Sequence, residues 1–249
     1  MKLSIVILTC NQRELTRQCL MSLGDVRQRD DVEVIVIDNN SGDDTVPMLE
    51  AEFPEVHVIV NDSNRGVAPA RNQGLEQATG ELVMLLDNDT IASVEAVDAL
   101  VAYMDTHPDV GLAGCRLVDA YGNTQDSAKP YPGIRSKIRN VLGLKPLQTR
   151  LAVDNDGATE PEYVIGACQV MRHTTIERVG LLDEAIFYGP EDADYCLRVR
   201  AAGMRVKYLP WISITHLWQR ATTHNLLSPL ARRHIAGLWH LYRKHRRWL

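Results

Sequence analysis

The sequence predicts an α/β fold with a mostly parallel sheet that is covered by helices on both faces. The prediction rests on four short aliphatic runs in the first half, on polar helical stretches between them, and on polar residues where each run ends. Uninterrupted β-branched and aliphatic runs are typical of strands buried on both faces, as in parallel sheets. Alternation of strand and helix then implies right-handed crossovers within one sheet.

The expected elements follow in a regular order along the chain. Strands are expected at residues 3–8, 32–37, 56–60, 82–86, 110–115, 163–171 and 205–209. Helices are expected at residues 12–23, 43–52, 66–79, 93–106 and 191–202, the last ending at a C′ glycine, Gly203. Residues 116–162 show little periodicity and several turn signals, which is typical of a functional or irregular segment.

Composition places the chain among ordinary globular proteins. It has 249 residues, of which 45% are hydrophobic, and a net charge of −5, which gives no sign of nucleic-acid binding. The five cysteines include no Cys-x-x-Cys pair, so we expect neither a disulfide framework nor a zinc site, and a reducing cytoplasm fits best. No apolar run approaches the roughly 18 residues that a membrane span needs.

Polar side chains follow each of the first four predicted strands. They are Thr9, Cys10 and Asn11, then Asp38, Asn39, Asn40 and Ser41, then Asn61, Asp62, Asn64 and Arg65, then Asp87, Asn88 and Asp89. In open α/β sheets, ligands bind beyond the carboxyl ends of the strands, so these groups predict a polar, partly anionic crevice. The glycine motif of dinucleotide-binding folds and the Walker A loop are both absent from the sequence.

Asp87 and Asp89 form the most specific part of this crevice. A bend at Asn88 lets both carboxylates face one cation, and hard divalent ions prefer such oxygens while they share further positions with phosphates. The alternative is an ordinary polar turn after a buried strand.

Four blocks of the sequence resemble the successive signatures of family 2 glycosyltransferases. They are SIVILTCNQ at 4–12, VIDNNSGD at 36–43, NRGVAPARN at 64–72 and LLDND at 85–89. The resemblance extends from residue 1 to about 217, and it is nearest to rhamnosyltransferase-like and galactofuranosyltransferase-like members from bacteria. It implies the GT-A fold, a Rossmann-like single domain, and transfer of a sugar with inversion of the anomeric centre.

The resemblance also implies a set of donor-binding residues. Thr9 and Asn11 would line the base pocket, Asp38 would hydrogen-bond the pyrimidine or its ribose, and Asn88 would reach the ribose. The full set is Thr9, Asn11, Asp38, Asn40, Arg65, Arg71, Asp87, Asn88, Gly166 and Ala167. For the two arginines, the alternative is solvated surface charge, but a guanidinium suits the phosphates of an anionic donor.

The implied metal ligands are Asp89, which would be the closest, Asp87 and His216. Imidazole is a reasonable ligand for manganese, and we expect Mn²⁺ or Mg²⁺ at this site. A lone histidine is more often structural, and this alternative remains open for His216.

The implied general base is Asp192, in the block GPEDADY at 189–195. The helix dipole stabilises acids in the first turn of a helix, and this effect alone can explain one or two carboxylates. It does not explain three acids that follow a loop expected to face the crevice. Glu191 is the alternative base, and Asp194 is expected to bind Arg198 at the i+4 position. Asp192 can act if it lies within hydrogen-bond reach of the acceptor hydroxyl.

The predicted division of the chain places donor binding in residues 1–115 and acceptor binding in residues 116–217. The irregular stretch 116–162 is a candidate acceptor loop or, equally, a solvated basic loop; its basic residues are Lys129, Arg135, Lys137, Arg139, Lys145 and Arg150.

The tail at residues 218–249 is predicted to form a basic amphipathic helix. From residue 229 onwards it carries six Lys and Arg residues and no acid, with aromatic residues on the opposite arc. The pattern fits a peripheral membrane helix on the inner face of the cytoplasmic membrane, or a terminal helix that packs on the core.

Together these features predict an inverting glycosyltransferase of polysaccharide or cell-wall synthesis. The donor would be a dTDP- or UDP-sugar, with dTDP-rhamnose as one candidate, and the acceptor a hydroxyl of a cell-surface glycan or a lipid-linked molecule. Two alternatives are a sugar nucleotidyltransferase, which would need a glycine-rich, lysine-bearing first loop, and a non-catalytic nucleotide-sugar-binding module.

Overall fold

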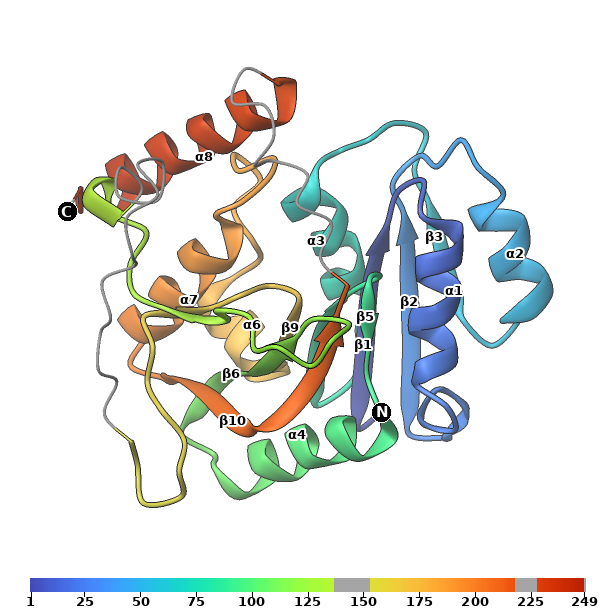
Figure 1. Cartoon of the computed structure of the whole chain (residues 1–249), viewed down its shortest axis with the longest axis horizontal. Helices are drawn as coiled ribbons and strands as arrows, with labels where there is room; N and C mark the ends of the chain where they lie inside the picture. The colour runs from blue at the N-terminus through green and yellow to red at the C-terminus, as the bar shows by residue number, and fades with distance from the viewer. Residues whose placement is uncertain (137–152, 218–227, 249) are drawn as a thin grey trace.

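The computed structural model of the chain describes residues 1–136, 153–217 and 228–248. Its centre is an eight-stranded sheet in the order β3-β2-β1-β4-β9-β6-β10-β5, and helices lie on both sides of this sheet (Figure 1). The predicted α/β class with a mostly parallel sheet is therefore confirmed.

The first half of the sheet consists of four parallel strands. They are β1 (Leu3–Thr9), β2 (Val32–Asp38), β3 (His57–Val60) and β4 (Leu82–Asp87). β1 pairs in parallel with β2 on one side and with β4 on the other, and β2 pairs with β3. All four strands therefore end at the same edge, as the sequence predicts.

Two hydrophobic cores lie on the two faces of the sheet. One face is covered by α1 (Arg13–Ser22), α2 (Thr45–Glu52) and α4 (Val94–Thr106). The other is covered by α3 (Val67–Gln77), α6 (His173–Val179) and α7 (Glu191–Ala201), and α8 (Pro229–His245) adds Leu238, Leu241 and Tyr242 to the same core. Along β1, Ile5 and Ile7 enter the first core and Val6 enters the second, so the strand is apolar on both faces.

The second half of the sheet is mixed in direction. Its strands are β5 (Thr90–Ile91), β6 (Val110–Val118), β9 (Cys168–Arg172) and β10 (Arg205–His216). β9 lies antiparallel between β4 and β6, and β10 pairs in parallel with β6 and antiparallel with β5. A short 3₁₀ helix, η1 (Val26–Gln28), precedes β2.

The prediction of one strand at residues 163–171 is wrong. The structure has two strands there, β8 (Tyr163–Val164) and β9, because β8 pairs with β7 (Ala128–Lys129) in a separate small sheet. The chain crosses from one sheet to the other at residues 165–167, and this break brings the backbone of Gly166 to the site described below.

Helix ends follow the expected capping chemistry. Ser93 and Ser228 each accept a hydrogen bond from the backbone N–H three residues later, which satisfies one of the free donors at the start of α4 and α8. Gly203 has a φ of +79° directly after α7, which confirms it as a C′ glycine.

The tail forms a helix at residues 229–245, and residues 218–227 of the predicted tail lie outside the described residues. Leu238, Leu241 and Tyr242 of α8 are buried against the domain, whereas Ile235 and Trp239 are each 57% exposed. Among the described helices, none combines the length and the apolarity that crossing a bilayer requires.

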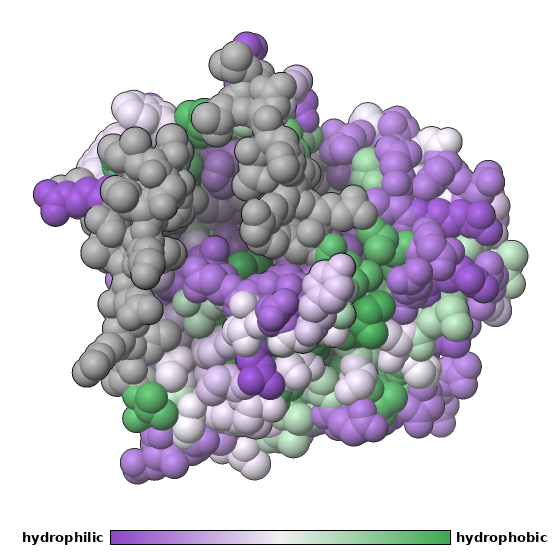
Figure 2. Space-filling model, viewed as in Figure 1, coloured by the Kyte–Doolittle hydropathy of each residue, from purple (hydrophilic) through white to green (hydrophobic). Residues whose placement is uncertain are grey.

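The surface seen from the side of Figure 1 is mostly hydrophilic. Figure 2 shows hydrophobic residues only in small groups on the part of this face that the described residues form. Lys137, Arg139, Lys145 and Arg150 of the predicted acceptor loop lie outside the described residues.

Candidate active site

The polar groups that follow β1, β2 and β3 are joined by backbone hydrogen bonds. The N–H of Asn39 donates to the carbonyl of Thr9 at 2.8 Å, and the N–H of Asn61 donates to the carbonyl of Asp38 at 2.9 Å. Parallel pairing thus continues one residue beyond the strands, and it holds the polar loops at one edge of the sheet.

Asp87, Asp89 and His216 form a cluster with metal-binding geometry. One ligand atom from each residue lies within 4.8 Å of the other two. Asp87 ends β4, and the turn at Asn88 and Asp89 reverses the chain into β5, which pairs with β10 so that His216 lies opposite Thr90. The bend that the sequence predicts at Asn88 is therefore present.

The donor set suits a hard divalent cation. Two carboxylates and one imidazole match the oxygen and nitrogen ligands of Mn²⁺, and the remaining positions would be left for phosphate oxygens and water. Further, the solvent-accessible share of the Asp89 side chain is only 14%, so its charge is costly without a cationic partner.

Gln125 orients the imidazole of His216. Its amide oxygen lies 2.7 Å from Nδ1 of His216, and its amide nitrogen donates to the backbone carbonyl of the same histidine at 2.7 Å. We assign a proton to Nδ1, because the amide oxygen of Gln125 can only accept a hydrogen bond. Nε2, which lies 3.4 Å from a carboxylate oxygen of Asp89, is then the atom that would bind a metal ion. Burial lowers the pKa of His216, but the contact with Asp89 outweighs it and the net pKa is raised.

Arg71 lies behind the metal cluster and is almost wholly buried. Its guanidinium forms an ion pair with Asp87, donates to the carbonyl of Gly166 at 2.9 Å, and lies 3.5 Å from a carboxylate oxygen of Glu191. Burial raises the pKa of Asp87, and the charge of Arg71 opposes that rise. Arg71 therefore joins the metal side of the site to the helix that carries the candidate base.

Gly166 is required by the position of this guanidinium. A Cβ atom at residue 166 would lie 2.7 Å from Nη1 of Arg71, which is closer than real side chains approach. The N–H of Gly166 donates to Oδ2 of Asp192 at 3.2 Å, so the same short segment contacts both Arg71 and the candidate base.

Asp192 and Glu191 begin α7 but have different surroundings. Asp192 is half-buried, and its second oxygen accepts from the N–H of Ala193 at 2.7 Å. Glu191 is 7% exposed, and its Oε2 atom has no hydrogen-bond partner among the described residues. Burial and the adjacent charge of Asp192 raise the pKa of Glu191 to about 7. As predicted, Asp194 instead forms an ion pair with Arg198 at 2.8 Å.

Asn88 and Thr9 bond to each other in the loops at the predicted base pocket. The amide of Asn88 donates to the hydroxyls of Thr9 and Thr16 at 3.1 and 3.0 Å, and these hydroxyls are 2.7 Å apart. One oxygen of Asp38 accepts from the N–H of Ser41 at 2.9 Å, whereas the other is buried without a partner among the described residues.

Asn11 and Asn40 shape the loops through positive φ angles of 53° and 67°. The side-chain oxygen of Asn11 accepts from the N–H of Gly42 at 2.6 Å, which ties the first loop to the second. Arg65 and Asn40 are exposed at the rim, whereas Ala167 is buried and accepts from the N–H of Asp87 at 3.0 Å.

Three supporting residues are absent from the sequence-based site. Asn39 is buried and forms hydrogen bonds with the side chains of Asn61 and Asn64 and with the N–H of Arg65. Thr16 accepts from the amide of Asn88, and Gln125 orients the imidazole of His216. Thr16 could have been identified from the sequence, because it is a polar residue on the inward face of a predicted helix, one turn after the helix begins. No signal in the sequence marks Gln125, because the contact with His216 depends on the mixed half of the sheet.

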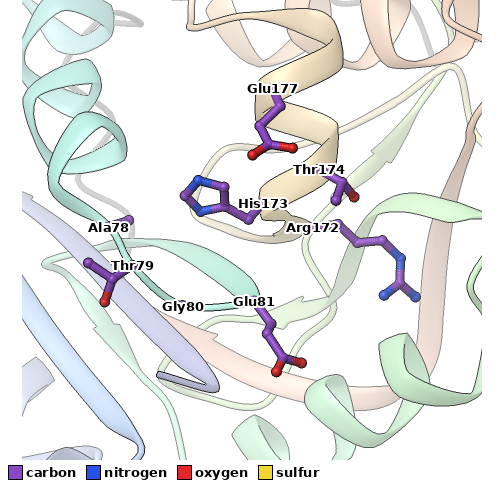
Figure 3. Close-up of a pocket in the computed structure, with 8 residues that line it drawn as sticks. All are labelled: Ala78, Thr79, Gly80, Glu81, Arg172, His173, Thr174 and Glu177. Carbon is purple, nitrogen blue, oxygen red and sulfur yellow. The ribbon is translucent and has the colours of Figure 1, made fainter.

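A cavity of about 640 Å³ lies at the opposite end of β4 from these carboxylates. Figure 3 shows its lining residues, which include Thr79, Gly80, His173 and Glu177 from the loop before β4 and from α6. Arg172 at its edge is bonded to the carbonyls of Met104, His107 and Val110. The cavity is therefore separate from the candidate active site.

The sequence is similar to those of two rhamnosyltransferases. The chain is 26% identical over 265 residues to an N-acetylglucosaminyl-diphospho-decaprenol L-rhamnosyltransferase of Mycobacterium tuberculosis, covering 99% of this chain and 86% of that protein. It is also 26% identical over 193 residues to the dTDP-rhamnosyl transferase RfbF of Shigella flexneri, covering 74% of this chain and 59% of that protein.

Solved structures share the fold at low sequence identity. A mannosyltransferase from Pyrobaculum calidifontis, in complex with GDP-Man and Mn²⁺, has a TM-score of 0.67 at 20% identity, covering 99% of this chain and 64% of that one. TarS 1-349 of S. aureus in complex with UDP has a TM-score of 0.65 at 17% identity, covering 99% of this chain and 72% of that one. The sequence model described as Glycosyl transferase family 2 matches residues 4–177, and the chain belongs to this glycosyltransferase family.

Proposed function

We propose that this glycosyltransferase moves a sugar from a dTDP- or UDP-sugar to a hydroxyl of a cell-surface glycan or a lipid-linked acceptor, with inversion at the anomeric carbon. The observation that carries the proposal is the connection from the metal cluster through Arg71 and Gly166 to Asp192. Family membership argues against the nucleotidyltransferase and the non-catalytic module.

Asp192 is the proposed general base. Its carboxylate accepts the proton of the acceptor hydroxyl as that oxygen forms a bond to the anomeric carbon. The bond from the anomeric carbon to the diphosphate oxygen breaks at the same time, and the electron pair leaves with the nucleoside diphosphate. The hydrogen bond from the N–H of Gly166 fixes the direction of the Asp192 carboxylate.

Asp87, Asp89 and His216 are the proposed holders of a divalent ion, which would neutralise charge on the departing diphosphate. The buried guanidinium of Arg71 opposes the rise that burial causes in the pKa of Asp87, and so favours the ionised carboxylate that a metal ion needs. Glu191, whose pKa is raised to about 7, is proposed to assist Asp192 as an electrostatic neighbour and not as a second base.

The proposed donor site uses the loops after β1, β2 and β3. The free, buried oxygen of Asp38 is an acceptor that matches the N3–H of uracil or thymine. Thr9, Asn11, Asn40 and Asn88 shape this pocket, and Arg65 at the rim is placed for the diphosphate. Gly166, whose missing Cβ admits the guanidinium of Arg71, and the buried Ala167 are the proposed neighbours of the donor sugar.

The similarity to two rhamnosyltransferases supports dTDP-rhamnose as the first donor to test. One of these relatives is named for a lipid diphosphate acceptor, which supports a lipid-linked acceptor for this chain. We assign donor binding to residues 1–115 and acceptor binding to residues 116–217, and we place the reaction on the cytoplasmic side of the membrane.

A thermal-shift screen in the presence of Mn²⁺ tests the donor. We expect dTDP- and UDP-sugars to raise the Tm of the wild type, because selective ligands stabilise the folded state, and GDP-mannose to leave it unchanged. In Asp38→Asn the shift should shrink, whereas Asp30→Asn, an exposed control, should keep it. A larger shift with GDP-mannose than with any pyrimidine donor would contradict the assignment of Asp38.

A further inference from the structure

The most informative feature outside the active site is the outward face of α8. Four described residues follow one another at helical spacing along it: Arg232, Ile235, Trp239 and Arg243. Ile235 and Trp239 are each 57% exposed, and the edge of Trp248 packs on Trp239 with ring centres 5.1 Å apart. Large apolar side chains therefore gather at the centre of a stripe with arginines at its ends.

The inner face of α8 fixes this stripe to the domain. Lys244 forms an ion pair with Asp183 at 2.6 Å, His245 bonds to the buried Asp194 at 2.8 Å, and Tyr242 donates to the carbonyl of Pro132 at 2.6 Å. These contacts use the inward side of the helix, so the exposure of Ile235 and Trp239 is not caused by a loosely attached tail.

The charge of the outward face is uncompensated within the described residues. Arg232, Arg243 and Arg246 are exposed, and none forms an ion pair with a described carboxylate. By contrast, Arg247 binds Glu162 and Arg233 lies over the ring of Phe187. The whole chain has a net charge of −5, so a positive face of this kind is a local feature.

A groove of about 500 Å³ lies beside Trp239 and is lined also by His240, Arg243 and Lys244. An indole beside the guanidinium of Arg243, which pairs with no described carboxylate, suits the boundary between phosphate headgroups and acyl chains, where tryptophan is favoured because its ring is apolar and its N–H is polar. We propose that α8 docks the protein on an anionic phospholipid bilayer through Ile235, Trp239 and Trp248, with Arg232, Arg243 and Arg246 on the headgroups.

The charges favour a bilayer over a second copy of the chain as the occupant. A two-fold dimer across this face would bring the same arginine-bearing stripe against itself, which places like charges together. An anionic membrane surface attracts each arginine and accepts the two tryptophans at its interface.

The docked helix lies next to the loop before the catalytic carboxylates. The ring of His234 bonds to the carbonyl of Gly189 at 3.0 Å, and Gly237 packs on Gly189 and Pro190, directly before Glu191 and Asp192. A lipid-linked acceptor would therefore be presented beside the base. This orientation rests on the proposed function, whereas binding to lipid requires neither donor nor acceptor.

Vesicle co-sedimentation of the full chain tests the proposal without a sugar substrate. We expect binding to vesicles of phosphatidylglycerol and phosphatidylcholine but not to pure phosphatidylcholine, and binding that weakens as salt rises. Arg232→Glu/Arg243→Glu should weaken partitioning by at least about 25-fold, since each basic residue at an anionic surface is worth about fivefold. Ile235→Asp/Trp239→Asp should weaken it by at least about tenfold.

The matched control is Met21→Asp/Tyr121→Asp, which charges two exposed apolar residues elsewhere, 58% and 90% exposed, and should bind as the wild type does. Nucleoside diphosphate release in detergent-free buffer, with a soluble acceptor, reports separately on catalysis. Three outcomes would overturn the docking surface: no binding to anionic vesicles, equal binding of the α8 variants and the control, or a wild-type dimer that only the α8 variants dissociate.

Discussion

The Nε2 atom of His216 lies 3.4 Å from a carboxylate oxygen of Asp89, although the two residues are 127 positions apart in the sequence. The antiparallel pairing of β5 with β10 produces this contact, because Thr90 is the partner of His216 in the register. The metal cluster therefore forms only when the last strand of the sheet is in place.

Removal of Asp89 should abolish the effect of Mn²⁺ on stability. For the wild type at a Mn²⁺ concentration of a hundred times Kd, we expect a rise in Tm of about 5–10 °C. Asp89→Asn should show almost none, because a neutral amide is a weak ligand for a divalent ion, while Asp30→Asn should behave as the wild type. Differential scanning calorimetry with and without EDTA measures this, and an unchanged Mn²⁺ shift in Asp89→Asn would place the ion elsewhere.

Gln125 should control metal affinity without touching the ion. Gln125→Ala removes both hydrogen bonds that orient the imidazole of His216, and loss of such a partner weakens metal affinity by about 10–100-fold. Isothermal titration with Mn²⁺ measures Kd directly. Gln28→Ala, an exposed control in η1, should leave Kd unchanged, and equal Kd values for both variants would show that His216 is not a ligand.

Gly166→Ala should impair catalysis more than folding. The added Cβ would lie 2.7 Å from Nη1 of Arg71, so the guanidinium must move away from its partners Asp87 and Glu191. We expect kcat to fall by at least about tenfold, because small displacements of a catalytic group are costly, and unfolding to be easier by about 1–3 kcal/mol. Steady-state kinetics beside urea unfolding separates the two effects, and an unchanged kcat would mean that this contact is not needed.

Glu191 should make stability depend on pH between 4.5 and 7. Its folded-state pKa is raised from 4.5 to about 7, so across this window the folded chain holds a proton that the unfolded chain has released. The free energy of unfolding therefore falls as pH rises through the window, by at most about 3 kcal/mol.

Urea unfolding at pH 5 and pH 8 in EDTA measures this fall. Glu191→Gln cannot ionise and should lack that part of the fall, whereas Glu177→Gln, at an exposed position, should keep it. If the free energy of unfolding changed equally with pH in the wild type and in Glu191→Gln, burial of Glu191 would not be the cause of the pH dependence.

The sequence was sufficient to predict the first half of the fold and the edge where the site lies. Runs such as residues 82–86 are apolar on both faces, and parallel strands with that pattern end together, so Thr9, Asp38 and Asp87 had to meet. The family resemblance added His216 and Asp192, which the structure brings to the same site, although their roles remain predictions.

The rest depends on pairing that no local pattern encodes. β9 inserts antiparallel between β4 and β6, and this long-range choice breaks the predicted strand at Gly166. The sequence predicts that Arg71 holds the donor, with solvated surface charge as the alternative, whereas its guanidinium is buried between Asp87 and Glu191. A buried charge of this kind depends on partners from distant segments, and these partners become apparent only when the sheet is assembled.

The central claim is that Asp192 accepts the acceptor's proton at a site organised by the metal cluster. Its most direct test is the rate of nucleoside diphosphate release with Mn²⁺, a pyrimidine nucleotide-sugar and an acceptor, compared between the wild type and Asp192→Asn. The account predicts a fall in kcat of at least about 100-fold with a nearly unchanged donor Kd. An Asp192→Asn enzyme that retains the wild-type kcat would contradict it.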